Sequence, residues 1–334
     1  MDATNVGGTR LPEQRTRTPH SRLIRSHTTS RLILLAAMML VPLASRGAIA
    51  DDEIDALAIV DDVKNRVMLF DRQTGDYIRD LVIPDAEQAQ APFDCELGPV
   101  IQNGQVRHEK TILVSDIRAN KILAYDYGSR GKFIKVFINN IAARGIAYDR
   151  DGKLLIAAGE AGVRKYEPDG SFIEVLAHDL VDGPSNAWDV LVRPVGREWW
   201  RGRDWEILVA DVNLDALLRF DMQGNPLGVF AKRKGFRHVE QLAWRGNGNV
   251  LAADPFANGV FEFDIDGDFI RKIQVRRPRG VIELGNGNLL ISSQRGVLEY
   301  DGLEGTLIST KMEGYPVTAP RFIRDLSKKL PSIR

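Results

Sequence analysis

The chain has few cysteine and histidine residues, which form disulfide bonds and bind metals in small proteins. Cysteine occurs once in 334 residues, at Cys95, so no intramolecular disulfide can form, and we expect Cys95 to be a buried, small apolar residue. No serine lies in a G-x-S-x-G motif, which argues against a common class of serine hydrolase. Histidine occurs five times, and after residue 50 only as His108, His178 and His238.

No charge of one sign dominates the chain, which has 45 basic and 45 acidic residues. Residues 1–50 hold seven basic and two acidic residues, so residues 51–334 carry five more acidic than basic residues. A mildly acidic chain without a large basic patch does not fit nucleic-acid binding.

The sequence LILLAAMMLVPLA (32–44) is apolar but too short to cross a membrane. A basic segment precedes it, and the small-x-small sequence AIA (48–50) follows it. This arrangement is typical of a secretory signal peptide. We therefore expect residues 1–50 to be removed, the mature chain to begin near Asp51 without a transmembrane span, and the protein to be secreted or periplasmic.

Beyond residue 50, one pattern of short apolar runs recurs six times. Runs of four to seven residues that are rich in Val, Ile, Phe and Tyr, with glycine between them, are typical of β-strands. One run of each unit ends in a small or acidic residue: ALAIVDD (56–62), ILVSD (112–116), LLIAA (154–158), ILVAD (207–211), VLAAD (250–254) and LLISS (289–293). The following run ends in an aromatic residue and an acid, the acids being Asp71, Asp126, Glu167, Asp221, Asp264 and Asp301.

These acidic residues lie 37 to 55 residues apart, which is the period of a four-stranded propeller blade. The first unit lacks an initial strand, and a matching segment, APRFIRDL (319–326), occurs at the far end of the chain. Pairing of that segment with the first unit would leave no open sheet edge. The sequence therefore predicts an all-β fold: residues 51–334 form a single six-bladed β-propeller of four-stranded antiparallel blades, with the first blade closed by the C-terminal strand.

Two stretches carry a family resemblance: RGIAYDRDGKLLIAAGEAGVRKYEPDGSFIEVL (144–176) and RGVIELGNGNLLISSQRGVLEYDGLEG (279–305). Both are similar to the NHL repeat, which reads approximately P-x-G-I-A-x-D, a glycine, an apolar strand ending in A-D, a strand ending in F-D, and x-x-G. The resemblance covers about residues 54–326 and implies an NHL-like six-bladed propeller. It implies no single activity, because that scaffold carries lyases, lactonases and binding modules alike.

In a propeller, the innermost strands begin at one end of the central axis, where the loops between second and third strands also turn; we call this end the mouth. Three arginines there would attract a small anionic or peptide ligand through paired N–H donors. The alternative is that each arginine pairs with an acid of a neighbouring blade and ties the blades together. The repeat places at the mouth Asp94, Arg144, Asn186, Glu240 or Gln241, Arg279 and Arg321 from the inner strands, and Asp62, Asp116, Asp211 and Asp254 from the loops.

No cofactor is predicted, and a divalent cation, calcium or zinc, is the alternative occupant of the mouth. Zinc would use three histidines, but His108 is expected at the opposite end of the blades from His178 and His238. Calcium would need several oxygen ligands, for which the best available set is Glu240, Asn186, Asp211 and Asp94. A metal-assisted lactonase or lyase is therefore the alternative function.

Two connections are longer than a blade needs, and both are expected on the face opposite the mouth. VGREWWRGRDWE (195–206) joins the first and second strands of its blade, and ELGPVIQNGQVRHEK (96–110) falls at the same place in another blade. Tryptophan and arginine are enriched at binding hot spots and stack on one another. The first insertion either packs on itself or forms a partner surface from Trp199, Trp200, Arg201, Arg203 and Trp205.

The sequence shows no coherent catalytic set. The leading prediction is therefore an exported, monomeric, non-catalytic propeller that acts as a ligand-binding or protein-interaction scaffold, with an envelope protein as one candidate partner. A metal-assisted enzyme and a purely architectural subunit of an envelope complex are the alternatives.

Overall fold

The computed structural model of the chain describes residues 55–83, 88–102, 105–127, 131–177, 185–195, 204–232, 235–315 and 318–327. The regular elements in these ranges are 24 β-strands, which form six four-stranded sheets. The described part contains no helix that is long and apolar enough to cross a membrane. The predicted signal peptide, residues 1–50, lies outside the described ranges.

Each sheet is one blade, whose strands run in order from the innermost to the outermost. Blade one is β24 (Pro320–Asp325), β1 (Ala56–Asp61), β2 (Arg66–Asp71) and β3 (Tyr77–Val82). Blade two is β4 (Pro92–Gln102), β5 (Gln105–Asp116), β6 (Lys121–Asp126) and β7 (Lys132–Asn139). Blade three is β8 (Ile146–Tyr148), β9 (Leu154–Ala157), β10 (Val163–Tyr166) and β11 (Phe172–Ala177).

The remaining three blades follow the same order. Blade four is β12 (Ala187–Pro194), β13 (Trp205–Asp211), β14 (Ala216–Phe220) and β15 (Pro226–Lys232). Blade five is β16 (Gln241–Trp244), β17 (Val250–Asp254), β18 (Gly259–Phe263) and β19 (Phe269–Gln274). Blade six is β20 (Pro278–Glu283), β21 (Leu289–Ser293), β22 (Gly296–Tyr300) and β23 (Leu307–Glu313).

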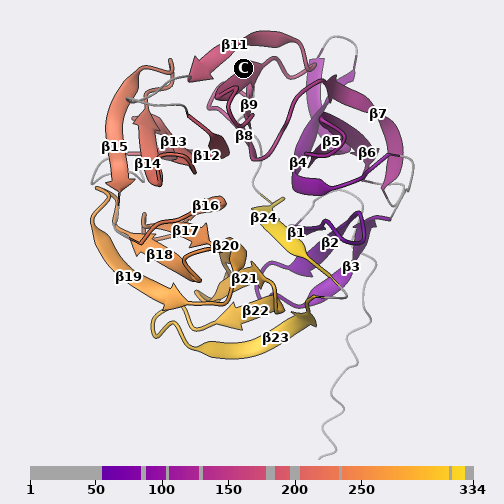
Figure 1. Cartoon of the computed structure of the whole chain (residues 1–334). Coiled ribbons are helices and arrows are strands. Elements are labelled where there is room, and N and C mark those ends of the chain that lie inside the picture. Colours follow the sequence, from indigo (N-terminus) through magenta and orange to yellow (C-terminus); the bar gives the residue numbers. More distant parts are fainter. Residues whose placement is uncertain are drawn as a thin grey trace, which may run out of the picture. The chain divides into compact units, whose positions relative to one another are not determined.

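The six blades form a ring in chain order around a central axis (Figure 1). The first strand of each blade lies nearest the centre, and the fourth lies at the rim (Figure 1). All pairs within a blade are antiparallel, for example β16 with β17 and β17 with β18. The prediction of a six-bladed propeller with four-stranded antiparallel blades is therefore confirmed.

The C-terminal strand closes the ring, as the sequence predicted. β24 runs antiparallel to β1, with Leu57 opposite Asp325 and Ile59 opposite Ile323. The Leu326 backbone N–H donates to the Ala56 carbonyl at 3.0 Å just beyond the paired residues. Blade one thus takes its innermost strand from the far end of the sequence, and the free edge of β1 is covered.

The core lies between neighbouring blades and not inside any single blade. Along β1, Ala58 and Val60 pack in one apolar cluster with Cys95 of blade two. Leu57 and Ile59 point the other way and pack in a second cluster with residues of blade six, because successive strand residues face opposite sides. A second strand that is buried on both faces reads as a continuous apolar run, which is the pattern in the sequence. Cys95 is fully buried, as predicted.

The acid-rich sequence FDIDGD (263–268) is a tight turn between the third and fourth strands of blade five. Asp264 Oδ1 accepts the backbone N–H groups of Asp266 and Asp268 at 3.0 and 2.8 Å. Gly267 has a φ of +97°, and a Cβ at this position would collide with the Phe230 carbonyl of blade four. The glycine therefore serves both the turn and the close approach of adjacent blades, and the aspartates stabilise the turn.

Candidate functional site

A buried ionic group crosses the central axis between the two ends of the ring. Arg324 of β24 donates from Nε to Asp94 Oδ1 of β4 at 2.8 Å and from Nη2 to Asp189 Oδ1 of β12 at 2.7 Å. Each carboxylate also accepts a backbone N–H from the next blade: Ile146 donates to Asp94 and Leu242 to Asp189, both at 2.8 Å. One guanidinium and two carboxylates thus join the inner strands of five blades.

Gln241 extends this group to the sixth blade. Its Oε1 accepts the backbone N–H groups of Val281 in β20 and Ile323 in β24, both at 3.1 Å. Its Nε2 donates to the Ile323 carbonyl at 2.6 Å. We call Asp94, Asp189, Gln241 and Arg324 the axial bar. The repeat placed Asp94 and Gln241 at the mouth, whereas the structure buries both within the channel, at 0% and 1% exposure.

Burial shapes the ionisation of the axial bar. Loss of solvent raises the pKa of Asp189 to about 6, although Arg324 favours its charged form. Burial likewise raises the pKa of Asp94 against the opposing effect of Arg324. Burial alone would lower the pKa of Arg324, but the carboxylates of Asp189 and Asp94 raise it well above its usual value. The guanidinium therefore stays charged and holds two carboxylates that would otherwise prefer to be neutral.

The aspartates that end the second strands, predicted as mouth residues, anchor loops at that end of the blades. Asp254 Oδ1 accepts the backbone N–H groups of Phe256 and Ala257 in the turn that follows β17. Its Oδ2 accepts those of Arg237 and His238, which lead into β16. Asp116 and Asp211 are fully buried and bridge the equivalent segments of blades two and four. Both oxygens of each carboxylate are therefore engaged within one blade.

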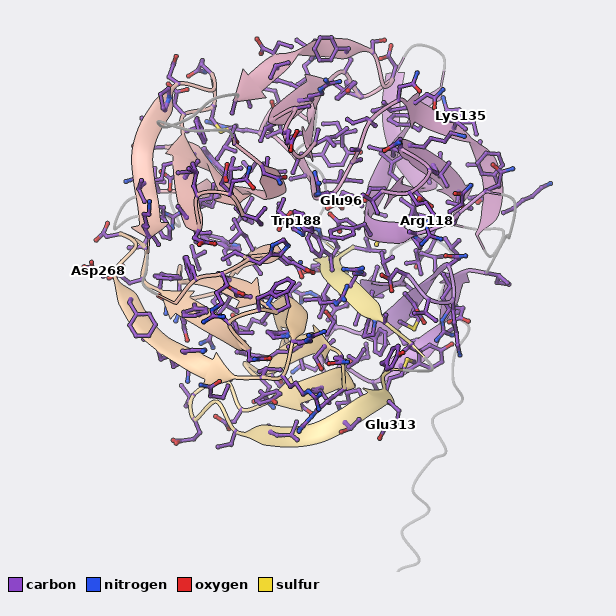
Figure 2. The ribbon with its side chains drawn as sticks, viewed as in Figure 1. Glu96, Arg118, Lys135, Trp188, Asp268 and Glu313 are labelled. Atoms are coloured by element: carbon purple, nitrogen blue, oxygen red, sulfur yellow. The ribbon has the colours of Figure 1, made fainter. Side chains whose placement is uncertain are left out.

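Removal of one such carboxylate should destabilise the fold. We expect Asp254→Ala to lower the free energy of unfolding by about 1–3 kcal/mol, because hydrogen bonds to four backbone N–H groups are lost. Urea unfolding followed by circular dichroism measures the change. Asp268 lies exposed at the rim of the ring (Figure 2), and Asp268→Ala should change stability by less than about 0.5 kcal/mol. Equal stability of the two variants would contradict the anchoring role.

The mouth itself is formed by arginines, two carboxyl groups and aromatic rings. Arg321 bonds to Asp62 Oδ2 from Nε at 2.6 Å and lies 3.7 Å from Glu240 Oε2. Arg279 Nη1 lies 4.0 Å from the same Asp62 oxygen. Arg144 reaches from the opposite side of the ring. We call Asp62, Arg144, Glu240, Arg279 and Arg321 the mouth cluster.

Aromatic side chains form the floor beneath the mouth cluster. The rings of Phe93 and Trp188 meet edge to face, with their centroids 5.7 Å apart. The Arg321 guanidinium lies over Phe93 at 4.9 Å, and that of Arg144 lies over Trp188 at 4.4 Å. Trp188 lies near the axis (Figure 2) and also contacts His238, at 4.4 Å between ring centroids. The stacking holds both guanidinium planes; the edge of Arg321 bonds to Asp62, whereas Nε and Nη1 of Arg144 have no hydrogen-bond partner among the described residues.

Several buried polar atoms of the mouth have no hydrogen-bond partner among the described residues. They include the donors Nε and Nη1 of Arg144 and Nη1 of Arg279. The acceptors Oδ1 of Asp62 and Oε2 of Glu240 belong to the same group. Buried polar atoms in folded proteins are nearly always satisfied, so a concentration of unpaired atoms marks a place where a polar ligand or water belongs.

The protonation of the mouth cluster follows from burial. Loss of solvent raises the pKa of Glu240 to about 7, although Arg321 favours its charged form. Burial also raises the pKa of Asp62. His238 has a lowered pKa because of burial and the two nearby guanidinium groups, against the effect of Asp254. Near neutral pH, three guanidinium groups therefore face Asp62 and a partly protonated Glu240, which leaves the mouth cluster positively charged.

A cavity of about 490 Å³ occupies the other end of the axis, where the inner strands finish. Arg324 and Gln241 of the axial bar lie in its wall, and apolar residues of the inner strands form most of the rest. Trp205, the only member of the predicted partner surface among the described residues, also lines this cavity. Trp199, Trp200, Arg201 and Arg203 lie outside the described ranges.

The residues of the calcium alternative do not converge. Asp94 is held by Arg324 inside the channel, and Asp211 Oδ2 accepts the Ser185 hydroxyl at 2.6 Å and the Asn186 backbone N–H at 3.0 Å. Asn186 and Glu240 keep an unpaired oxygen each. Within the part of the chain that the structure describes, no three His, Cys, Asp or Glu side chains are grouped as a metal site would require.

The repeat placed Asp62, Arg144, Glu240, Arg279, Arg321 and His238 near the mouth, but it missed Asp189, Arg324 and Trp188. The missed signal was a charged residue inside an apolar inner strand, as in NAWDVLV (186–192) and RFIRDL (321–326). Such a residue has to be paired where strands converge on an axis, because an unpaired buried charge is very costly.

Six antiparallel four-stranded blades around an axis define the chain as a six-bladed β-propeller. No family model matches the sequence, and no curated protein matches it. Solved structures nevertheless share the fold. A chain of a nidogen/laminin complex has a TM-score of 0.62 at 15% identity, covering 83% of this chain and 100% of that chain.

Two further structures are similar. A protein of unknown function from Bacteroides caccae has a TM-score of 0.54 at 14% identity, covering 80% of this chain and 97% of its own. Streptogramin B lyase has a TM-score of 0.52 at 12% identity, covering 81% of this chain and 87% of its own. At these identities the likeness shows the fold alone. It supports a six-bladed propeller and does not distinguish the NHL type from others.

Proposed function

We propose that this propeller is a non-catalytic binding protein that holds a small anionic ligand, a carboxylate or a phosphate, at the mouth cluster. The observation that carries the proposal is the set of buried, unpaired guanidinium N–H groups of Arg144 and Arg279 on opposite sides of the mouth. An anion between them would satisfy these donors and offset the positive charge of the cluster.

The stacking contacts favour binding of an anion over simple blade-to-blade pairing. Arg144 has no carboxylate hydrogen-bond partner among the described residues, and it is held in place by the Trp188 ring. Arg279 approaches Asp62 only to 4.0 Å, because Arg321 already occupies that carboxylate. Arg321 bonds to Asp62 of its own blade and lies 3.7 Å from Glu240 of blade five, so among the described residues no mouth arginine makes a close pair with an acid of an adjacent blade.

Exchange of Arg279 should weaken anion binding strongly. We expect Arg279→Ala to reduce the affinity for inorganic phosphate or succinate by about tenfold or more, as is usual for loss of a charged hydrogen bond. Isothermal titration calorimetry on the purified protein measures it. Arg150 is exposed in the turn after β8, away from the mouth, and Arg150→Ala is the matched control that should bind as the parent does. Unchanged binding by Arg279→Ala, or no binding of either anion by the parent, would contradict the proposal.

The titration with succinate, whose charge is constant near pH 7 whereas that of phosphate changes, should depend on pH. Below about pH 7, Glu240 is protonated, so it no longer competes with the ligand for Arg321 and the cluster gains net positive charge. Affinity for the anion is therefore greatest below this pH and falls as the pH rises through it, by at most about tenfold per pH unit. In Glu240→Gln this dependence should disappear.

We also propose that the protein is exported and that it belongs to the NHL-like group of propellers. Residues 1–50 have the features of a secretory signal, so we infer that the protein acts outside the cytoplasm. The repeat sequences favour an NHL-like propeller within the six-bladed class.

A further inference from the structure

The cavity at the end of the axis opposite the mouth has the features of a second ligand site. Its walls come from all six inner strands and are mostly apolar, with Ala147, Leu191, Ala243 and Ile323 among them. Its volume of about 490 Å³ lies in the range of small-molecule sites. The axial bar separates it from the mouth, so a ligand here would be distinct from the proposed anion.

Three aromatic residues line this cavity: Tyr148 at the end of β8, Trp205 at the start of β13 and Trp244 at the end of β16. The Tyr148 hydroxyl donates to the Leu97 carbonyl at 2.8 Å, which fixes its ring. Both tryptophans are partly exposed. Aromatic rings around an apolar cavity are the usual means by which proteins bind an organic ammonium group.

Among the described residues in and beside the cavity lining, acidic side chains outnumber basic ones. Glu96 of β4 lies near the axis (Figure 2) and lines the cavity. The pKa of Tyr148 is raised, first by burial and second by the negative charge of Glu96. The charge of Glu96 therefore acts on the aromatic side of the cavity. Arg324 is the only basic residue in the lining, and both Asp94 and Asp189 contact it. The carboxyl groups in and beside the lining therefore outnumber the one guanidinium.

The β4–β5 hairpin and the two ends of the β12–β13 connection lie at this end of the ring. The β4–β5 hairpin continues to Gln102 and Gln105, which lie opposite each other, well past the residues that line the cavity. The connection from β12 to β13 begins and ends beside Pro194 and Trp205, both of which line the cavity. In repeat proteins, insertions that gather on one face often mark the binding face.

We propose that this cavity binds a small organic cation, a quaternary ammonium group with an apolar body, with Glu96 opposite its charge and the aromatic residues around it. The apolar walls exclude water from the cation, which strengthens its attraction to the carboxylate and to the ring faces. The inference does not depend on the anion site at the mouth.

Two probes of the same shape test the proposal. Choline and 3,3-dimethylbutan-1-ol differ in that a carbon replaces the charged nitrogen. We expect choline to bind the purified protein and to change its tryptophan fluorescence, whereas the neutral alcohol should bind at least about tenfold more weakly. Equal binding of the two probes would show an uncharged apolar site and overturn the proposal. No binding of choline, or preferential binding of the anion 3,3-dimethylbutyrate, would also overturn it.

Variants locate the site. Glu96→Gln and Trp244→Leu should each weaken choline binding by about tenfold while phosphate binding at the mouth is unchanged. Arg279→Ala, at the other end of the axis, is the matched control and should bind choline as the parent does. The circular dichroism spectrum and urea midpoint of each cavity variant show that it is folded, whether or not the mouth binds phosphate. Choline binding that survives both cavity variants, or that is lost in Arg279→Ala, would contradict the assignment.

Discussion

Exchange of Arg324 for methionine is expected to lower the free energy of unfolding by about 3–5 kcal/mol at neutral pH. Methionine fills a similar volume but leaves Asp94 and Asp189 without the cation that both contact, and both carboxylates are fully buried. Urea unfolding monitored by tryptophan fluorescence measures the loss. The matched control is Arg72→Met, because Arg72 is an exposed arginine that also pairs with an aspartate of β24. We expect it to cost at most about 1 kcal/mol.

The loss of stability in Arg324→Met should become smaller as the pH falls. In the parent protein, the folded-state pKa of Asp189 is about 6, above the ordinary value of 3.8. A raised carboxyl pKa contributes stability that is complete below the unfolded-state pKa and is lost as the pH rises through the folded-state pKa. Without Arg324, both carboxyl pKa values rise further. The destabilisation of Arg324→Met should therefore shrink between pH 7.5 and pH 5. A penalty that is small, or that grows on acidification, would contradict the role assigned to the axial bar.

Removal of the C-terminal strand should abolish cooperative folding. A variant that ends at residue 317 lacks β24, which leaves the edge of β1 open and removes Arg324 from between Asp94 and Asp189. Gln241 loses its two hydrogen bonds to Ile323 as well. We expect this variant to aggregate or to unfold without a sharp transition, which size-exclusion chromatography and thermal unfolding would show.

A circular permutation provides the control for that experiment. Residues 318–327 can be placed ahead of Asp55 through a short linker, because Leu326 already contacts Ala56 through a backbone hydrogen bond of 3.0 Å. All pairings of blade one are then restored with sequential connectivity. This variant should unfold cooperatively, within about 2 kcal/mol of the unpermuted residues 55–327. A stable truncated protein, or an unstable permuted one, would show that β24 does not close the ring as described.

The recurring run that ends in an acid, such as ILVAD (207–211), determined much of the fold. It predicted the second strands and the number of blades. The final aspartate was also informative, because Asp211 accepts backbone N–H groups from two loops at the mouth. Its bonds to the N–H groups of Asn213 and Leu214 in the turn that follows are local, so the pattern repeats in the sequence.

The direction in which each side chain of the inner strands points was harder to predict from the repeat. Glu240 and Gln241 were interchangeable in the alignment, yet one carries an unpaired oxygen at the mouth and the other cross-links three blades inside the channel. A shift of one residue reverses the facing of a strand, and only the packed ring fixes it. The same uncertainty concealed Trp188, whose ring supports Arg144, beside the fully buried Asp189.

The sequence by itself determined the six-bladed, four-stranded architecture and its closure by the C-terminal strand, because strand periodicity and turn residues are local properties. Only the tertiary structure decided which polar residues meet on the axis. Asp94, Asp189 and Arg324 are separated by up to 230 residues in the chain and become neighbours only when the ring closes. Their pairing is enforced by the cost of burying unpaired charge, which depends on the whole assembly of blades.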